Sequence, residues 1–111
     1  MRFLALLLAL LCVSGVSAYD EDFIRGDCNS DGVIDWSDVI FLNNAMEYGD
    51  PYPSCFDACD VNDSGWIDQN DRNWLINWLA YDLFPPAAPF PGCGQDPTPG
   101  DPFDCDFSGC S

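Results

Sequence analysis

Oxygen-bearing side chains recur at fixed positions in two twelve-residue segments of this chain. The first segment runs from Asp27 to Asp38 and the second from Asp60 to Asp71, and the two align at an offset of 33 residues. Each segment has Asp, Asn or Ser at positions 1, 3, 5, 9 and 12 and glycine at position 6. That spacing is typical of a loop that wraps a hard cation in oxygen atoms. The two segments therefore predict two calcium sites.

The ligands are predicted from EF-hand-type geometry, in which position 7 contributes a backbone carbonyl and the other positions contribute side-chain oxygens. Calcium suits such an oxygen set better than magnesium, which requires a tighter octahedral shell. The alternative without a metal is a pair of Asx-rich turns. The predicted metal ligands are Asp27, Asn29, Asp31, Val33, Asp35 and Asp38 in the first loop, and Asp60, Asn62, Ser64, Trp66, Asp68 and Asp71 in the second.

An apolar stretch with helical periodicity follows each loop and predicts one helix per repeat. We expect these helices over residues 39–47 and 72–81, each ended by a segment that contains glycine or proline. At position 8 of the loops, Ile34 and Ile67 are expected to point inward and to pair in a short two-stranded contact. The inner faces of the helices are predicted to consist of Val39, Leu42, Met46, Leu75, Trp78 and Leu79.

The two ends of the chain differ in composition from its middle. Residues 1–18 combine a basic start, a short apolar run and a small-residue cleavage site, which predicts an export signal peptide. Residues 85–111 are rich in proline, glycine and cysteine and predict an irregular, disulfide-tied tail, with disorder as the alternative. Between them, residues 19–84 are expected to form the domain, with repeats at 27–48 and 60–81. The expected fold class is small and mainly α.

Six cysteines follow residue 18, and an even number in a short exported chain predicts disulfides. The alternative is a zinc site, but the chain has no histidine and no paired CxxC spacing. A domain of this size buries only a marginal core, so covalent bridges would stabilise it substantially. The cysteines are Cys28, Cys55, Cys59, Cys93, Cys105 and Cys110, and the count alone leaves their pairing open.

The chain is strongly acidic, with 19 Asp and Glu residues and a formal net charge of −16. After residue 18, only Arg25 and Arg72 oppose these charges. Such a surface repels nucleic-acid phosphates and anionic membranes, so neither is an expected partner. The chain has no histidine or lysine to serve as a catalytic base, and calcium claims the best-placed carboxylates. We therefore do not expect an enzyme.

The order loop, helix, linker, loop, helix resembles the type I dockerin module over residues 25–84. The loops have the form D-x-N-x-[DS]-G-x-[IV]-D-x-x-D, with Asp instead of Glu at position 12. The resemblance implies two half-EF-hands that pack about a pseudo-twofold axis and bind two calcium ions. It also implies docking onto a cohesin domain, which in the family typically holds carbohydrate-active enzymes on a scaffold.

Family contacts with cohesin come from loop positions 10 and 11 and from the outward face of each helix. Residues 36–37 and 69–70 differ from the small hydroxyl pairs that are common at these positions in cellulosomal dockerins. The partner-binding residues that the resemblance implies are Trp36, Ser37, Ile40, Asn43, Asn44, Gln69, Asn70, Asn73, Ile76 and Asn77.

The pseudo-twofold packing implied by the resemblance brings the entrances of the two loops together, which favours a disulfide between the repeats. The paired prolines after the second helix turn the chain back, which favours a link from the domain to the start of the tail. The last two cysteines would then pair locally. The expected disulfides are Cys28–Cys59, Cys55–Cys93 and Cys105–Cys110.

Together these observations predict a secreted or periplasmic, monomeric, calcium-binding module for protein–protein interaction, with a cohesin-like partner. A link to polysaccharide degradation would follow from the family association alone. The alternative is a stand-alone extracellular EF-hand calcium buffer or sensor. A sensor exposes a methionine-rich groove, whereas Met46 is the only methionine after residue 18.

Overall fold

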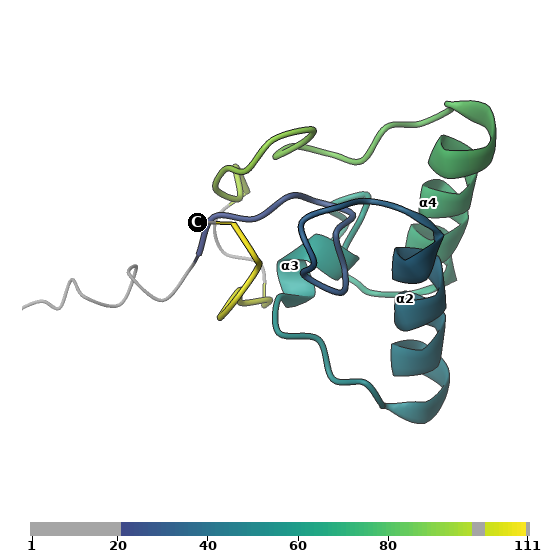
Figure 1. Ribbon diagram of the computed structural model, residues 1–111, viewed down its shortest axis with the longest axis horizontal. Coiled ribbons are helices and arrows are strands. Elements are labelled where there is room, and N and C mark those ends of the chain that lie inside the picture. Colours follow the sequence, from purple (N-terminus) through teal and green to yellow (C-terminus); the bar gives the residue numbers. More distant parts are fainter. Residues whose placement is uncertain (1–20, 99–101, 111) are drawn as a thin grey trace, which may run out of the picture.

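The computed structural model describes residues 21–98 and 102–110, and the expected signal peptide lies outside this range. Its helices are α2 (Trp36–Tyr48), α3 (Phe56–Cys59) and α4 (Gln69–Tyr81). Helices α2 and α4 stand together and run in opposite directions, while the loops, α3 and the tail lie to one side of them (Figure 1). The small, mainly helical fold that the sequence predicts is confirmed. None of the described helices has the length and apolar character needed to cross a membrane.

Both long helices begin earlier than residues 39 and 72, the starts that their periodicity predicts. The Asp35 side chain caps α2 by accepting a hydrogen bond from Ser37 N at 3.0 Å. In return, the Asp38 carboxylate accepts from Asp35 N at 2.9 Å, which completes a capping box. Asp68 and Asp71 cap α4 in the same way. The last two ligand positions of each loop therefore also form the first turn of a helix.

Two of the core clusters each bring a loop of one repeat against the helix of the other. Leu42 of α2 is fully buried beside Ile67 of the second loop. Leu75 of α4 is fully buried, and Ile34 of the first loop packs against its cluster. The predicted pairing of Ile34 with Ile67 is wrong, because each isoleucine packs against the opposite helix. Within the described residues, the isolated β-bridges lie elsewhere.

The predicted inner faces of the helices are only partly buried. Val39, Leu42 and Leu75 are buried, whereas Met46, Trp78 and Leu79 keep part of their surface exposed. Trp78 packs edge-on against Phe90 of the tail at a ring-centroid distance of 5.4 Å. The tail thus covers part of α4 that the two repeats alone leave open.

The tail runs back along the lead-in segment that precedes the first loop. Phe23 and Gly94 exchange backbone hydrogen bonds of 2.9 and 3.0 Å, and Arg25 N donates to the Pro89 carbonyl at 2.7 Å. Further along the tail, the Cys105 carbonyl accepts a hydrogen bond from Glu21 N at 3.0 Å. The described part of the tail is therefore hydrogen-bonded to the domain.

The disulfide between the repeats joins Cys28 and Cys59, the pair expected from the packing of the loops. Their Cα atoms are 4.5 Å apart, and both cysteines are fully buried beside Leu42. Because Cys28 follows the first residue of one loop and Cys59 precedes the first residue of the other, this bridge holds the two loop entrances together.

The expected tail pairings Cys55–Cys93 and Cys105–Cys110 are wrong. The structure instead contains Cys55–Cys105 and Cys93–Cys110. Pairing of the tail with Phe23 carries Cys93 away from the linker and towards the end of the chain. Residues 104–106 then run antiparallel to residues 54–56, which places Cys105 opposite Cys55. The backbone pairing of the tail therefore determines both of its disulfides, and side-chain periodicity in the sequence does not predict that pairing.

Candidate metal centre

Three carboxylates converge in the first loop. Asp27, Asp31 and Asp38 each bring one oxygen to within 4.8 Å of the others. Asp27 and Asp38 are buried, whereas Asp31 is exposed. The cluster therefore combines two buried carboxylates with one exposed carboxylate. These hard oxygen donors suit a calcium ion.

The backbone of the first loop fixes its two buried carboxylates. Asp27 accepts a hydrogen bond from Gly32 N at 2.9 Å, and Gly32 adopts a left-handed conformation with φ of 90° that favours glycine. Asp38 accepts from Asn29 N at 3.1 Å and from Asp35 N at 2.9 Å. The first and last ligand positions are thus held by the backbone of the loop that they close.

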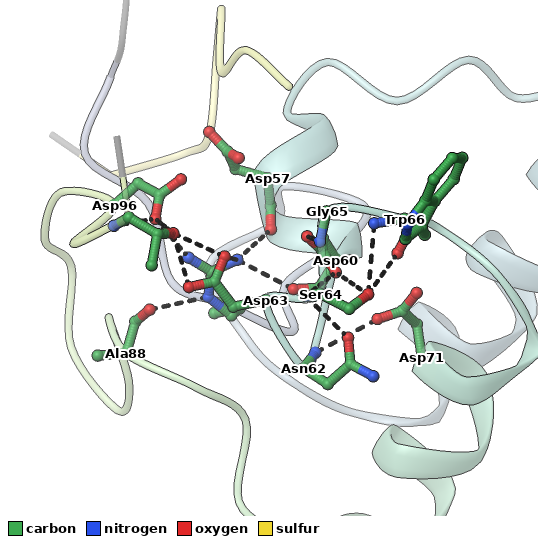
Figure 2. Close-up of polar contacts among 12 residues, drawn as sticks. Asp57, Asp60, Asn62, Asp63, Ser64, Gly65, Trp66, Asp71, Ala88 and Asp96 are labelled. Carbon is green, nitrogen blue, oxygen red and sulfur yellow. Dashed lines mark hydrogen bonds and ion pairs between the residues drawn. The ribbon is translucent and has the colours of Figure 1, made fainter. Parts of the chain in front are cut away.

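The second loop repeats these contacts at an offset of 33 residues. Asp60 accepts from Gly65 N at 2.9 Å and from Ser64 N at 3.1 Å, and Asp71 accepts from Asn62 N at 3.3 Å. Figure 2 shows Asp60, Asn62, Ser64 and Asp71 directed towards one another. Among the described residues, only the first loop gathers three acidic side chains this closely, since the second has Ser64 at position 5.

Burial and crowding disfavour the charged form of these carboxyl groups. Burial raises the pKa of Asp27 to about 6 and that of Asp38 and Asp71 to about 7, although backbone N–H donors oppose the shift. Neighbouring carboxylates raise the pKa further: Asp27 and Asp31 act on Asp38, and Asp60 and Asp68 act on Asp71. A bound cation would relieve this electrostatic cost, so the donor set and its electrostatics both fit calcium.

The remaining predicted ligands differ in their hydrogen-bond partners and in their exposure. Asp35 and Asp68 are partly occupied as helix caps. The Asn29 amide nitrogen donates to Ser37 Oγ at 3.0 Å, and its oxygen accepts from Asp31 N, so the oxygen faces the loop interior. The side chains of Val33 and Trp66 are 57% and 73% exposed, which leaves only their backbone carbonyls available to the loops.

A buried arginine that the sequence patterns do not predict supports the second loop. Arg25 has no exposed surface, and its Nη1 donates to the carbonyls of Asp57 at 3.1 Å and Asp60 at 2.9 Å. Its Nε donates to the Ala88 carbonyl at 2.8 Å. Arg25 therefore joins the first residue of the second loop to α3 and to the tail. Two features of the sequence could have indicated this role. Arg25 lies two residues before the first loop, and the chain has few cationic residues.

The tail is attached to position 4 of each loop. Ser30 Oγ donates to the Phe107 carbonyl at 3.2 Å, and Thr98 Oγ1 donates to the Asp63 carboxylate at 2.7 Å. Both position-4 residues have a left-handed backbone, with φ of 60° at Ser30 and 55° at Asp63. Arg25 also forms an ion pair with Asp63, with Nη1 lying 3.6 Å from Oδ1. The tail thus contacts the turn of each loop from outside.

The implied partner-binding residues do not form a uniform exposed face. Trp36 and Ile40 are 49% and 62% exposed on α2. By contrast, Asn43 accepts a hydrogen bond from Arg72 Nη1 of α4 at 2.9 Å, and Ile76 packs against the Val39, Val61 and Leu75 cluster. Of the others, Ser37, Gln69, Asn70 and Asn73 are exposed, and Asn44 and Asn77 are half-buried.

A comparison with models of protein families matches residues 25–80, about half of the chain, to the dockerin type I domain. The chain belongs to the type I dockerin family. Dockerin domains are protein–protein interaction modules, and the calcium-binding character of type I dockerins supports calcium as the metal here. Together with the three disulfides, the family points to an extracellular protein. No curated protein and no solved structure matches the chain.

For the metal-free protein, we predict that the free energy of unfolding falls as the pH rises from about 4 to about 7. The pKa values of Asp27, Asp38 and Asp71 are raised above 3.8, so the folded state binds more protons than the unfolded state in this interval. Saturating calcium should reverse this dependence, because the ion binds deprotonated carboxylates. Urea unfolding of metal-stripped protein across this interval measures the effect.

Two variants make the pH measurement specific. Asp38→Asn removes one of the shifted groups and should flatten the profile, whereas Asp82→Asn, at the exposed end of α4, should leave the profile unchanged. A metal-free protein whose stability increases with pH over the same range would contradict the assignment of these carboxylates.

We also predict that the first loop binds calcium more tightly than the second. The first loop has four ligand carboxylates and the second three, because Ser64 occupies the position of Asp31, and ligand charge tunes affinity in such loops. Calorimetric titration of Asp60→Ala and Asp27→Ala reports the first and second sites separately. The exchanges Asp31→Ser and Ser64→Asp should reverse the order. A second site that is the tighter one in the unexchanged background would refute the prediction.

Proposed function

We propose that this protein is an exported dockerin that binds two structural calcium ions and docks onto a cohesin-like protein partner. The observation that carries the proposal is the start of α2, where metal-loop carboxylates and exposed apolar side chains share one helical turn. Asp35 and Asp38 form the capping box there, and Trp36 and Ile40 project from the same turn into solvent. An ion that fixes these carboxylates would also fix the orientation of the apolar pair.

The equivalent hydrogen bonds in the two loops support two calcium sites related by a pseudo-twofold axis. Gly32 N donates to Asp27 and Gly65 N donates to Asp60, each at 2.9 Å. The reciprocal packing of each loop against the opposite helix supports the same relation. The predicted ligands would hold the two ions, and the ions would supply positive charge to a chain that has very little of its own.

The first repeat supplies the main partner surface in this proposal. Its Trp36 and Ile40 are exposed apolar side chains, the type of residue that dominates binding energy in protein interfaces. The corresponding turn of α4 presents Gln69, Asn70 and Asn73, which are exposed but polar. The second repeat would therefore contribute a hydrogen-bonding rim.

Export accounts for the three disulfides and for the signal pattern over residues 1–18. The association with polysaccharide-degrading assemblies rests on the family. A calcium sensor that opens on binding is disfavoured, because the Cys28–Cys59 bridge joins the entrances of both loops. No catalytic role is proposed for any residue.

Binding to immobilised cohesin domains tests the proposal, and calcium should be required for it. Trp36→Ala and Ile40→Ala should each weaken binding roughly tenfold or more, as expected for exposed apolar anchors. Leu83→Ala is a matched control, since Leu83 is 51% exposed beyond the end of α4. Biolayer interferometry against a panel of type I cohesins provides the measurement.

Each outcome of this experiment decides part of the proposal. Loss of binding in Trp36→Ala but not in Leu83→Ala supports the α2 surface. Binding that persists in chelator would refute the role of calcium. Failure of every cohesin in the panel to bind the calcium-loaded protein would refute the cohesin-like partner.

A further inference from the structure

The linker and the end of the tail lie side by side next to α3 (Figure 1). Cys55 and Cys105 pair there in an antiparallel bridge and form a buried disulfide. The flanking backbone hydrogen bonds run from Phe56 N to the Asp104 carbonyl and from Asp106 N to the Ser54 carbonyl, each at 3.0 Å. Because successive residues of an extended segment point to opposite faces, the four flanking side chains project away from the buried disulfide.

These side chains line a cavity of about 340 Å³. Its aromatic wall is ordered by internal packing: Tyr52 meets Phe56 edge-on at 5.0 Å, and Phe56 stacks on Phe103 at 6.0 Å between ring centroids. Asp104 and Asp106 line the same cavity and are exposed. The cavity therefore combines aromatic rings with two negative charges on a covalently fixed backbone.

The chemistry of this cavity favours a cationic ligand. Its two carboxylates only accept hydrogen bonds, and the Ser54 hydroxyl already donates to the Phe107 carbonyl at 2.8 Å, which leaves the Tyr52 hydroxyl as the donor among the lining side chains. Lys and Arg side chains carry donors only, and aromatic faces attract both. A neutral sugar, in contrast, needs donors as well as acceptors from its site.

No arginine of the described chain competes for these carboxylates. Arg25 is buried against the second loop, and Arg72 donates to Asn43 between the long helices. Within residues 21–98 and 102–110, neither Asp104 nor Asp106 forms an ion pair. The two charges are therefore available to a partner, and the net charge of −16 attracts one that is basic.

An apolar groove of about 460 Å³ adjoins the cavity and shares the wall made by Tyr52, Phe56 and Phe103. Its other side is formed by Met46 of α2 and by Trp66, whose side chain is 73% exposed. A side chain in this groove would lie next to a cation in the cavity. The groove uses the flank of α2 that carries Met46, and neither Trp36 nor Ile40 lines it.

We propose that the cavity and the groove together bind a segment of a protein partner in which a lysine or arginine stands next to an apolar residue. The cation occupies the cavity between the aromatic wall and the two carboxylates, and the apolar side chain occupies the groove. This site is separate from the α2 surface of the proposed function, and a failure of cohesin binding would leave it intact.

Amide chemical shifts of the calcium-loaded full chain test the site with a simple probe. N-acetyl-arginine amide should shift the signals of Phe56, Asp104 and Asp106 saturably, whereas the isosteric but neutral N-acetyl-citrulline amide should not. Asp104→Asn/Asp106→Asn should weaken binding by at least about threefold, as expected for two exposed ion pairs. The control Glu47→Gln/Asp82→Asn removes two exposed charges outside both cavities and should not weaken it.

Two further comparisons test the aromatic wall and the groove. Tyr52→Ala should weaken binding roughly twofold to fivefold, while Tyr81→Ala, which alters a similarly exposed tyrosine at the end of α4, should not. A dipeptide amide of leucine and arginine, in at least one of its two orders, should bind more tightly than arginine amide alone. Equal binding of citrulline and arginine amides, no effect of the carboxylate variant, or shifts with cellobiose but not with arginine amide would each overturn the proposal. A dipeptide that gains nothing in either order would remove the groove from the site.

Discussion

Crowding of carboxylates at the starts of two helices is the constraint on which this structure depends. Asp27 and Asp38 are buried together, and Asp60 and Asp71 are buried together in the second loop. Asp38 and Asp71 are needed twice, because each closes its loop and completes the capping box of a helix. Asp27 and Asp60 accept from the glycine N–H of their own loops. Burial disfavours the ionised form, and neighbouring carboxylates add repulsion, so the pKa values of Asp27, Asp38 and Asp71 are raised. A bound divalent cation would resolve that conflict.

The rest of the chain keeps the two loops in place by means that do not depend on a metal. The Cys28–Cys59 bridge joins their entrances, and Arg25 supplies a buried positive charge to the second loop. The tail then contacts position 4 of each loop, at Ser30 and at Asp63. We infer that the tail preorganises both loops, so that less conformational entropy is lost when calcium binds.

Apolar periodicity made the helices α2 and α4 predictable from the sequence, and the packing implied by the family resemblance made the Cys28–Cys59 bridge predictable. Oxygen spacing predicts the ligand positions, which remain a prediction. The helix starts were missed because Asp35 and Asp68 act as caps as well as predicted ligands. The tail bridges and the role of Arg25 depend on pairing between distant segments, such as residues 23 and 94, for which the tail has no periodic signal.

Thermal unfolding of the intact, disulfide-bonded chain with saturating calcium and after complete removal of metal tests the central claim most directly. If the ions balance the buried carboxylates, calcium should raise the melting temperature by roughly 15 °C or more, given the stabilisation expected from ligands far above their Kd. The double variant Asp27→Ala/Asp60→Ala should lose this response. Equal melting temperatures of the unmodified chain with and without calcium would contradict the account.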